Sequence, residues 1–208
     1  MEAKHRRWLQ RAVHVGSLAP LAALLWLSWR DRLGPVPVAA ATRLLGRYAL
    51  ALLLLSLVPT AARIVTGGTW LTRLRRPLGL YAFLYAALHV LAFVGLDYGF
   101  ALGLVATVVG ESRRELVGLA ALVILAVLAV TSIPQLVKGL GRTWKRLHRL
   151  VYVAAGLVVL HYAWNYKELR TWPVAAGVCL VVLLAVRLPP VARWLRRRGD
   201  ASSPGSSA

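Results

Sequence analysis

Long apolar runs separated by short basic stretches dominate the sequence. At 1.5 Å per residue, a helix needs about 20 residues to cross the roughly 30 Å of hydrocarbon in a bilayer. Six runs approach that length and are bounded by charged residues: Val13–Trp29, Leu44–Ala62, Leu78–Leu96, Leu116–Ile133, Leu147–Trp164 and Trp172–Val186. The pattern predicts an all-α integral membrane protein, a bundle of six transmembrane helices joined by loops.

One apolar stretch and several prolines modify this scheme. Tyr98–Val109 has 12 residues and would reach only about 18 Å as a helix, so we expect a re-entrant or interfacial segment in the third loop. Pro59 and Pro134 are expected to kink or end the second and fourth spans. Pro173 suits the first turn of the sixth span, and Pro189 and Pro190 should stop that span.

Composition agrees with a membrane protein. Hydrophobic residues make up 59% of the chain and charged residues 16%, and the mean hydropathy is +0.64. The net charge of +19 does not indicate nucleic acid binding, because the basic residues lie between apolar runs and form no patch with interleaved aromatics. Cys179 is the single cysteine and lies in an apolar run, which excludes an intrachain disulfide framework.

The distribution of basic residues predicts the orientation. Of the 26 lysines and arginines, 18 lie at the span ends on the side of the N-terminus and 8 lie on the other side. Because cytoplasmic loops are enriched in Lys and Arg, we expect both termini in the cytoplasm. Residues 1–198 are predicted to form one transmembrane domain, and Gly199–Ala208, with its four serines, a disordered tail.

Two histidines at matched depth are the main candidates for chemistry. His89 and His161 lie in the third and fifth spans, which run in the same direction, at about 16 Å and about 20 Å from the cytoplasmic ends. Imidazole is a suitable iron ligand, and two rings at one depth can hold one haem iron from opposite sides. A haem with both axial positions filled by protein transfers electrons. The depth places such a haem in the outer half of the membrane.

Other interpretations stay open at this point. Histidines within a membrane also hydrogen-bond neighbouring helices without holding a cofactor. His148 lies among basic residues at the cytoplasmic edge and would point about 140° away from His161 on one ideal helix. It is a candidate for a second haem or a flavin contact, or an interfacial residue, with His14 as its weak candidate partner. The basic clusters at 73–76 and 145–146 suit anionic groups or simply mark the cytoplasmic side.

The histidine-bearing segments resemble a known family. Residues 76–89 read RPLGLYAFLYAALH, residues 144–152 read WKRLHRLVY, and residues 161–164 read HYAW. These segments resemble the ferric reductase-like transmembrane family, and in particular its haem-binding subunits of bacterial methionine sulfoxide reductase systems. The likeness extends to about Arg198.

The resemblance implies a multi-pass protein of the bacterial inner membrane with haem b, one group with a second left open, and FMN binding. His89 and His161 match the axial haem ligands, and His148 matches a third histidine of the family. Electrons would come from the quinone pool or a cytoplasmic flavin reductase. They would pass to MsrP, a periplasmic molybdopterin enzyme that reduces methionine sulfoxide in oxidised proteins. The chain itself would do no substrate chemistry.

Two rival functions follow from the same residues. A quinol-linked ferric reductase would deliver electrons to iron chelates instead of to a protein. A haem-free transporter or assembly protein would use its histidines for packing or proton relay.

Overall fold

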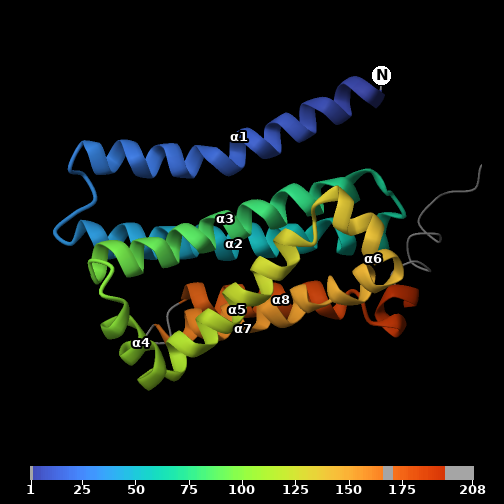
Figure 1. The fold of residues 1–208 in the computed structure, drawn as a ribbon. Coiled ribbons are helices and arrows are strands. Elements are labelled where there is room, and N and C mark those ends of the chain that lie inside the picture. Colours follow the sequence, from blue (N-terminus) through green and yellow to red (C-terminus); the bar gives the residue numbers. More distant parts are fainter. Residues whose placement is uncertain (1, 166–170, 195–208) are drawn as a thin grey trace, which may run out of the picture.

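The computed structural model describes residues 2–165 and 171–194, and within these ranges the regular structure is helical, without strands. Figure 1 shows the helices in chain order. Their bounds are α1 Glu2–Trp29, α2 Pro37–Thr66, η1 Trp70–Leu74, α3 Arg75–Ala92, η2 Phe93–Asp97, α4 Leu102–Glu111, α5 Arg113–Val130, α6 Pro134–Leu147, α7 Leu150–Trp164 and α8 Thr171–Ala185. The all-α prediction is confirmed for the described residues.

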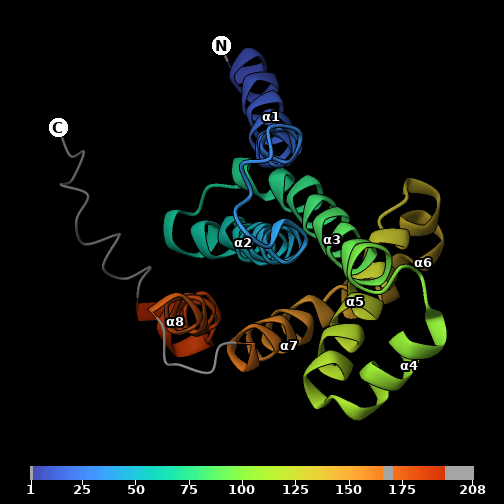
Figure 2. The same cartoon turned by 90° about the vertical axis from the view of Figure 1, so that its left-hand side faces the viewer.

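Four helices form the centre of the bundle. α2 packs along α3 and α5 along α7, and contacts of α3 with α5 and of α2 with α7 join the two pairs. α1 lies outside against α2 and α3, and α8 lies against α7 and α2, as Figure 2 shows along the helix axes. The central packing buries Ala82, Ala154 and Ala155 completely. Such small side chains let helix backbones approach closely, which is how helices associate within membranes.

Among the described residues, three helices are long and apolar enough to cross a membrane: Arg7–Trp29, Pro37–Thr66 and Trp70–Asp97. A fourth crossing is available if α5 and α6 count as one broken span, although they bend by 111° between them. α7 and α8 have 15 residues each and would reach about 22 Å as helices. The coarse prediction of a helical membrane protein is therefore supported.

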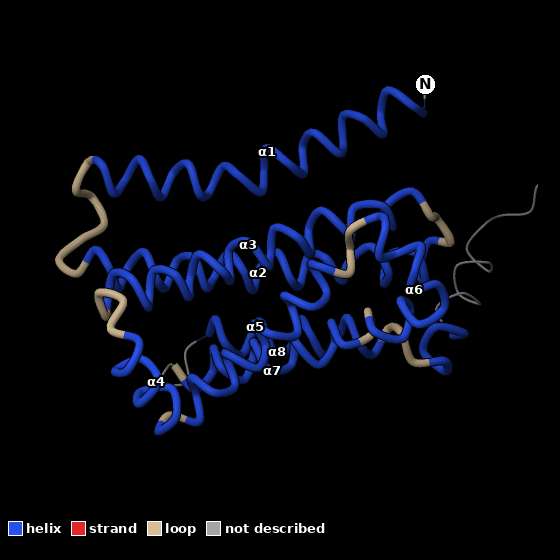
Figure 3. The backbone as a smooth tube through the Cα atoms, viewed as in Figure 1, coloured by secondary structure: helices blue, strands red, loops and turns tan. Residues whose placement is uncertain are grey.

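The segment between the fourth and fifth predicted spans differs from expectation. Instead of a loop, residues 134–147 form helix α6, which turns away from α5 at Pro134 (Figure 3). Proline cannot continue the hydrogen-bond ladder of α5 but fits the first turn of a new helix. Pro59 was expected to kink or end the second span. It does not end the span, because α2 continues through Pro59 to Thr66.

Other boundaries follow the sequence closely. The short apolar stretch predicted at 98–109 overlaps helix α4, whose 10 residues are too few to cross a bilayer. Pro173 lies in the first turn of α8, and α8 ends at Ala185, before the paired prolines. The predicted tail at 199–208 lies outside the described residues.

The two ends of the bundle differ in composition. The start of α1, the connection from α2 to α3, helix α6 and residues 186–194 lie at one end (Figure 1). We call this the basic end, because residues 73–76, 142–149 and 187–193 of this end carry arginines and lysines. The start of α5 and the end of α7 lie at the opposite end, near α4.

A buried tyrosine fastens the outer helix α1 to the centre. Tyr85 of α3 is fully buried, and its hydroxyl donates a hydrogen bond of 2.7 Å to the carbonyl oxygen of Ser17 in α1. One turn earlier, the hydroxyl of Tyr81 lies 2.9 Å from Nδ1 of His14. Leu24 of α1 is buried in the core, and Leu9, Val13 and Leu21 pack against it, so the two polar contacts add to an apolar attachment.

We expect Tyr85→Phe to destabilise the folded protein by about 1 kcal/mol, the usual net value of one hydrogen bond. Thermal unfolding in detergent measures the effect. Tyr81→Phe, which removes the hydrogen bond to His14, is the matched control and should cost less because that contact is exposed to solvent. Equal stability of Tyr85→Phe and the unaltered protein would contradict the role given to Tyr85.

Candidate functional site

The structure brings His89 and His161 together at the centre of the bundle. His89 comes from α3 and His161 from α7, and their ring centres lie 6.3 Å apart. The ring planes are inclined at 77° to each other. The sequence predicted that the two histidines lie at similar depth, and in the structure their rings lie next to each other.

Each of the two rings is fixed by a backbone carbonyl of the neighbouring helix. Nδ1 of His89 lies 2.8 Å from the carbonyl oxygen of Thr42 in α2, and Nδ1 of His161 lies 2.9 Å from that of Arg114 in α5. A carbonyl oxygen accepts hydrogen bonds but cannot donate them. Nδ1 therefore carries the proton in both rings, and Nε2 keeps its lone pair. Metal-binding histidines are oriented in this way.

The distance between the rings fits two ligands of one metal. An imidazole nitrogen binds a metal at about 2.0 Å and lies about 1.1 Å from its ring centre, so two rings on opposite sides of one metal have centres about 6.2 Å apart. The observed 6.3 Å agrees. Among residues 2–165 and 171–194, no three His, Cys, Asp or Glu side chains gather as a metal site. Two imidazoles alone suit haem iron, whose porphyrin supplies the remaining nitrogens.

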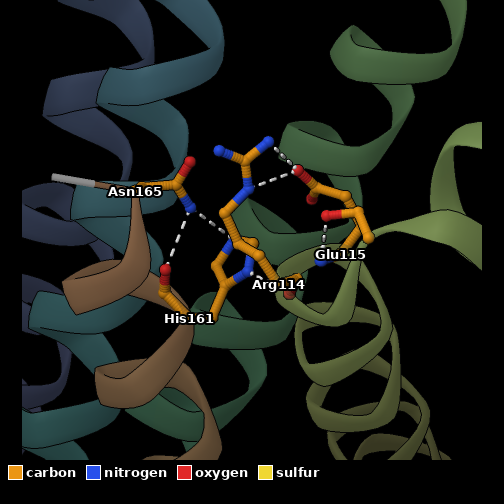
Figure 4. A network of polar contacts seen from close by, with 5 residues as sticks. Arg114, Glu115, His161 and Asn165 are labelled. Carbon is orange, nitrogen blue, oxygen red and sulfur yellow. Dashed lines mark hydrogen bonds and ion pairs between the residues drawn. The ribbon is translucent and has the colours of Figure 1, made fainter. Parts of the chain in front are cut away.

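A polar network surrounds His161 at the end of α7 (Figure 4). The Asn165 amide donates to the His161 carbonyl at 3.0 Å and lies 3.4 Å from Nε2 of the same ring. Across from it, the Arg114 guanidinium contacts the Glu115 carboxylate at 2.6 Å. Glu115 is only 15% exposed, and a carboxylate with so little water around it needs a positive partner. Arg114 supplies this charge, and the carbonyl of the same residue holds His161. The network fixes the start of α5 relative to the end of α7.

His148 lies apart from the histidine pair. The sequence placed it on one helix with His161, and this was wrong, because α7 begins at Leu150 and His148 follows the end of α6. Its ring stacks on Trp144, with ring centres 4.0 Å apart, and its Nε2 lies 3.2 Å from the Thr131 hydroxyl. Trp144 in turn donates to the Thr131 carbonyl at 2.9 Å. These contacts hold α6 against the end of α5. They stabilise the sharp bend between these two helices.

His14, the suggested partner of His148, contacts Tyr81 instead. The structure brings no second imidazole to His148 among the described residues, since the ring contacts of the other histidines lie elsewhere.

A half-buried arginine lies at the basic end. The guanidinium of Arg187 lies 4.6 Å from the ring centre of Tyr152 and donates a hydrogen bond of 2.7 Å to the carbonyl oxygen of Leu57. Its Nε and Nη1 atoms are buried without a hydrogen-bond partner in the described part of the chain. Burial lowers the pKa of this guanidinium, Tyr152 opposes that shift, and Arg75 adds to it. Arg187 therefore keeps two buried donors that the described part of the chain leaves unused, and a guanidinium donor of this kind suits an anion.

Sequence reasoning missed the groups that orient the rings. The acceptors are main-chain carbonyls of Thr42 and Arg114, and every residue has such a group, so residue type gives no signal for them. Arg187 was counted only as a topological charge, because nothing in the sequence distinguishes it from its exposed neighbours.

Comparison with known proteins adds the family. Residues 45–159 match the family described as "Ferric reductase like transmembrane component". The chain is 44% identical over 196 residues to "Protein-methionine-sulfoxide reductase heme-binding subunit MsrQ" of Rhodospirillum rubrum, covering 92% of each chain. The protein of the same name from Deinococcus radiodurans is 42% identical over 191 residues, covering 91% of this chain and 94% of the relative.

A third relative with this name, from Bordetella pertussis, is 41% identical over 189 residues and covers 90% of each chain. The similarity extends over about nine-tenths of the chain in all three cases. The chain belongs to the MsrQ family of ferric reductase-like transmembrane proteins.

Proposed function

We propose that this chain is the haem-binding, electron-transferring membrane subunit of a methionine sulfoxide reductase system. The observation that carries the proposal is the pair His89 and His161, with ring centres 6.3 Å apart and both Nδ1 atoms bonded to carbonyls. The relatives' names, which say "heme-binding subunit" of a protein-methionine-sulfoxide reductase, support the same conclusion.

His89 and His161 would hold one haem b. Bound there, haem would supply one-electron redox chemistry. The carbonyls of Thr42 and Arg114 would keep the two rings oriented for it. With both imidazoles serving as iron ligands, the role would be electron relay and not substrate chemistry.

We further propose six spans with both termini in the cytoplasm of a bacterial cell and the chain in its inner membrane. In this scheme the basic end is cytoplasmic, which agrees with the excess of Lys and Arg there. The histidine ring of α7 lies near the helix end opposite the basic end. A haem held there would be placed to reduce a periplasmic partner, the molybdopterin enzyme MsrP. Residues 1–198 would form this one transmembrane domain.

FMN is proposed as an additional cofactor at the basic end. The basic end carries the positively charged or titratable side chains of Arg75, His148 and Arg187. The unpaired donors of Arg187 suit a phosphate group. His148 is then a contact of this site and not the ligand of a second haem. Electrons would enter here from the quinone pool or from a cytoplasmic flavin reductase.

We expect His89→Ala and His161→Ala each to abolish haem binding, because each variant removes one of the two imidazoles that would hold the iron. His148→Ala and His14→Ala are matched controls that should keep a full complement of haem. The Soret absorbance per purified chain measures the outcome. A normal Soret band in the His89→Ala, His161→Ala double variant would contradict this pair as the haem ligands. A colourless unaltered protein would contradict haem binding altogether and favour the transporter alternative.

The electron acceptor separates the two redox proposals. In membrane vesicles with the haem chemically reduced, we expect rapid reoxidation when the exported molybdopterin reductase and a methionine sulfoxide protein are added together. Ferric chelates should reoxidise the haem slowly. Faster reoxidation by the chelates than by the reductase would favour a ferric reductase instead.

For the flavin, we expect Arg187→Met to lower the FMN content per chain, because the substitution keeps the apolar contact with Tyr152 but removes the donors. Flavin fluorescence after denaturation measures bound FMN. Arg193→Met, which alters an exposed arginine of the same end, is the control and should retain FMN. Equal FMN in both variants would show that Arg187 does not hold the phosphate.

A further inference from the structure

The two halves of the histidine site are built alike. In each half, the imidazole hydrogen-bonds a backbone carbonyl that lies 47 residues earlier in the chain. This is the carbonyl of Thr42 for His89 and that of Arg114 for His161. A glycine follows each carbonyl residue by four positions, Gly46 in α2 and Gly118 in α5. Every member of the second half therefore lies 72 positions after its counterpart (161 − 89, 114 − 42 and 118 − 46).

The same offset extends along the helices. Buried residues of the first pair of helices recur as buried residues of the second: Ala49 and Ala121, Leu53 and Leu125, Ala82 and Ala154. α2 and α5 run in one direction and α3 and α7 in the other (Figure 1). The centre of the bundle thus contains two copies of one antiparallel helix pair, related as parallel repeats are related in membrane proteins.

The copies diverge at the basic end. α2 continues to Thr66, whereas α5 ends at Val130, whose counterpart in the first copy is Val58. Helix α6 occupies the segment that follows. The two helix pairs match around His89 and His161 but differ at the basic end. This indicates that the shared geometry serves the histidine site and not the connections between helices.

The glycines explain how a ring reaches a carbonyl within a helix. The carbonyl oxygen of a helical residue already accepts the N–H of the residue four positions later. A second donor must approach that oxygen over the later residue, which is Gly46 or Gly118 here. An added Cβ at Gly46 would lie 3.2 Å from Nδ1 of His89. At Gly118 the Cβ would lie only 2.8 Å from Nδ1 of His161, closer than real contacts allow.

We propose that Gly46 and Gly118 are equivalent positioning residues of one haem site that is built from two copies of a helix pair. By leaving room for the imidazoles, the two glycines set the direction in which each Nε2 atom points. The inference rests on the proposed function for the identity of the haem, but the contacts of the glycines with the rings do not depend on it. Because the Gly118 contact is the tighter, a methyl group there should displace the ring more than one at Gly46.

Glycine-to-alanine variants test this, with two matched controls. Gly79 in α3 and Gly156 in α7 lie on the ligand helices themselves, and an added Cβ meets nothing within 4 Å at either position. We expect Gly118→Ala to weaken haem binding by about 10–100-fold, the usual effect of losing an outer-shell contact. Gly46→Ala should have a smaller effect on affinity but shift the haem midpoint potential. Gly79→Ala and Gly156→Ala should leave both quantities unchanged.

A second measurement does not depend on haem. Thermal unfolding of haem-free protein should show Gly118→Ala lowering the melting temperature when His161 is present. In a His161→Ala background the same substitution should raise it, because the clash is gone and alanine favours the helix. The same cycle applies to Gly46 with His89.

The outcomes distinguish this inference from the proposed function. If Gly118→Ala keeps normal haem affinity and potential, or lowers the melting temperature equally in both backgrounds, the positioning role is wrong, even when His89→Ala and His161→Ala lose haem. If the histidine variants retain haem, the proposed function fails, while the unfolding cycle still decides whether the glycines position the rings.

Discussion

The hydrogen bond from each imidazole Nδ1 to a backbone carbonyl is the contact on which the central site depends. A buried ring N–H without an acceptor costs several kcal/mol in hydrocarbon, so a histidine inside the bundle needs such a partner. Thr42 and Arg114 supply it from helices that are already fully hydrogen-bonded. The bond also determines which nitrogen keeps its lone pair. Both Nε2 atoms therefore keep a lone pair that a metal could use, and at His161 this nitrogen lies 3.4 Å from the Asn165 amide, which a metal would displace.

This bond constrains the packing of the four central helices. α2 must pass close to α3, and α5 close to α7, for the rings to reach across. Small side chains allow this approach: glycine where the rings cross the helices and alanine at Ala82 and Ala154, which are fully buried. Many other large apolar residues face outward, where lipid would cover them in a membrane. The exposed leucines and valines of α5, α7 and α8 are therefore expected for a lipid-facing surface.

The two ends of the bundle have different chemistry. At the end of α7, the charges of Arg114 and Glu115 balance each other beside His161. At the basic end, Arg187 has unused donors and lies near other cationic groups without a described acidic partner. An electron relay needs an entry and an exit on opposite faces of the membrane. The asymmetry between the ends suits that task, with anionic cofactors or donors at the basic end and a partner protein at the other.

The sequence by itself determined the membrane class, most helix positions and the two histidines of the central pair. Apolar run length and the scarcity of polar groups inside the runs are one-dimensional properties, so they can be read from the chain directly. Tertiary structure alone decided the acceptors of the rings, because a main-chain carbonyl is present at every residue. It also decided that residues 134–147 form a helix and that His148 leaves the line of α7, since contacts among Thr131, Trp144 and His148 hold that turn. The duplication was present in the sequence as an offset of 72, but only the matched contacts of Gly46 and Gly118 gave it a physical meaning.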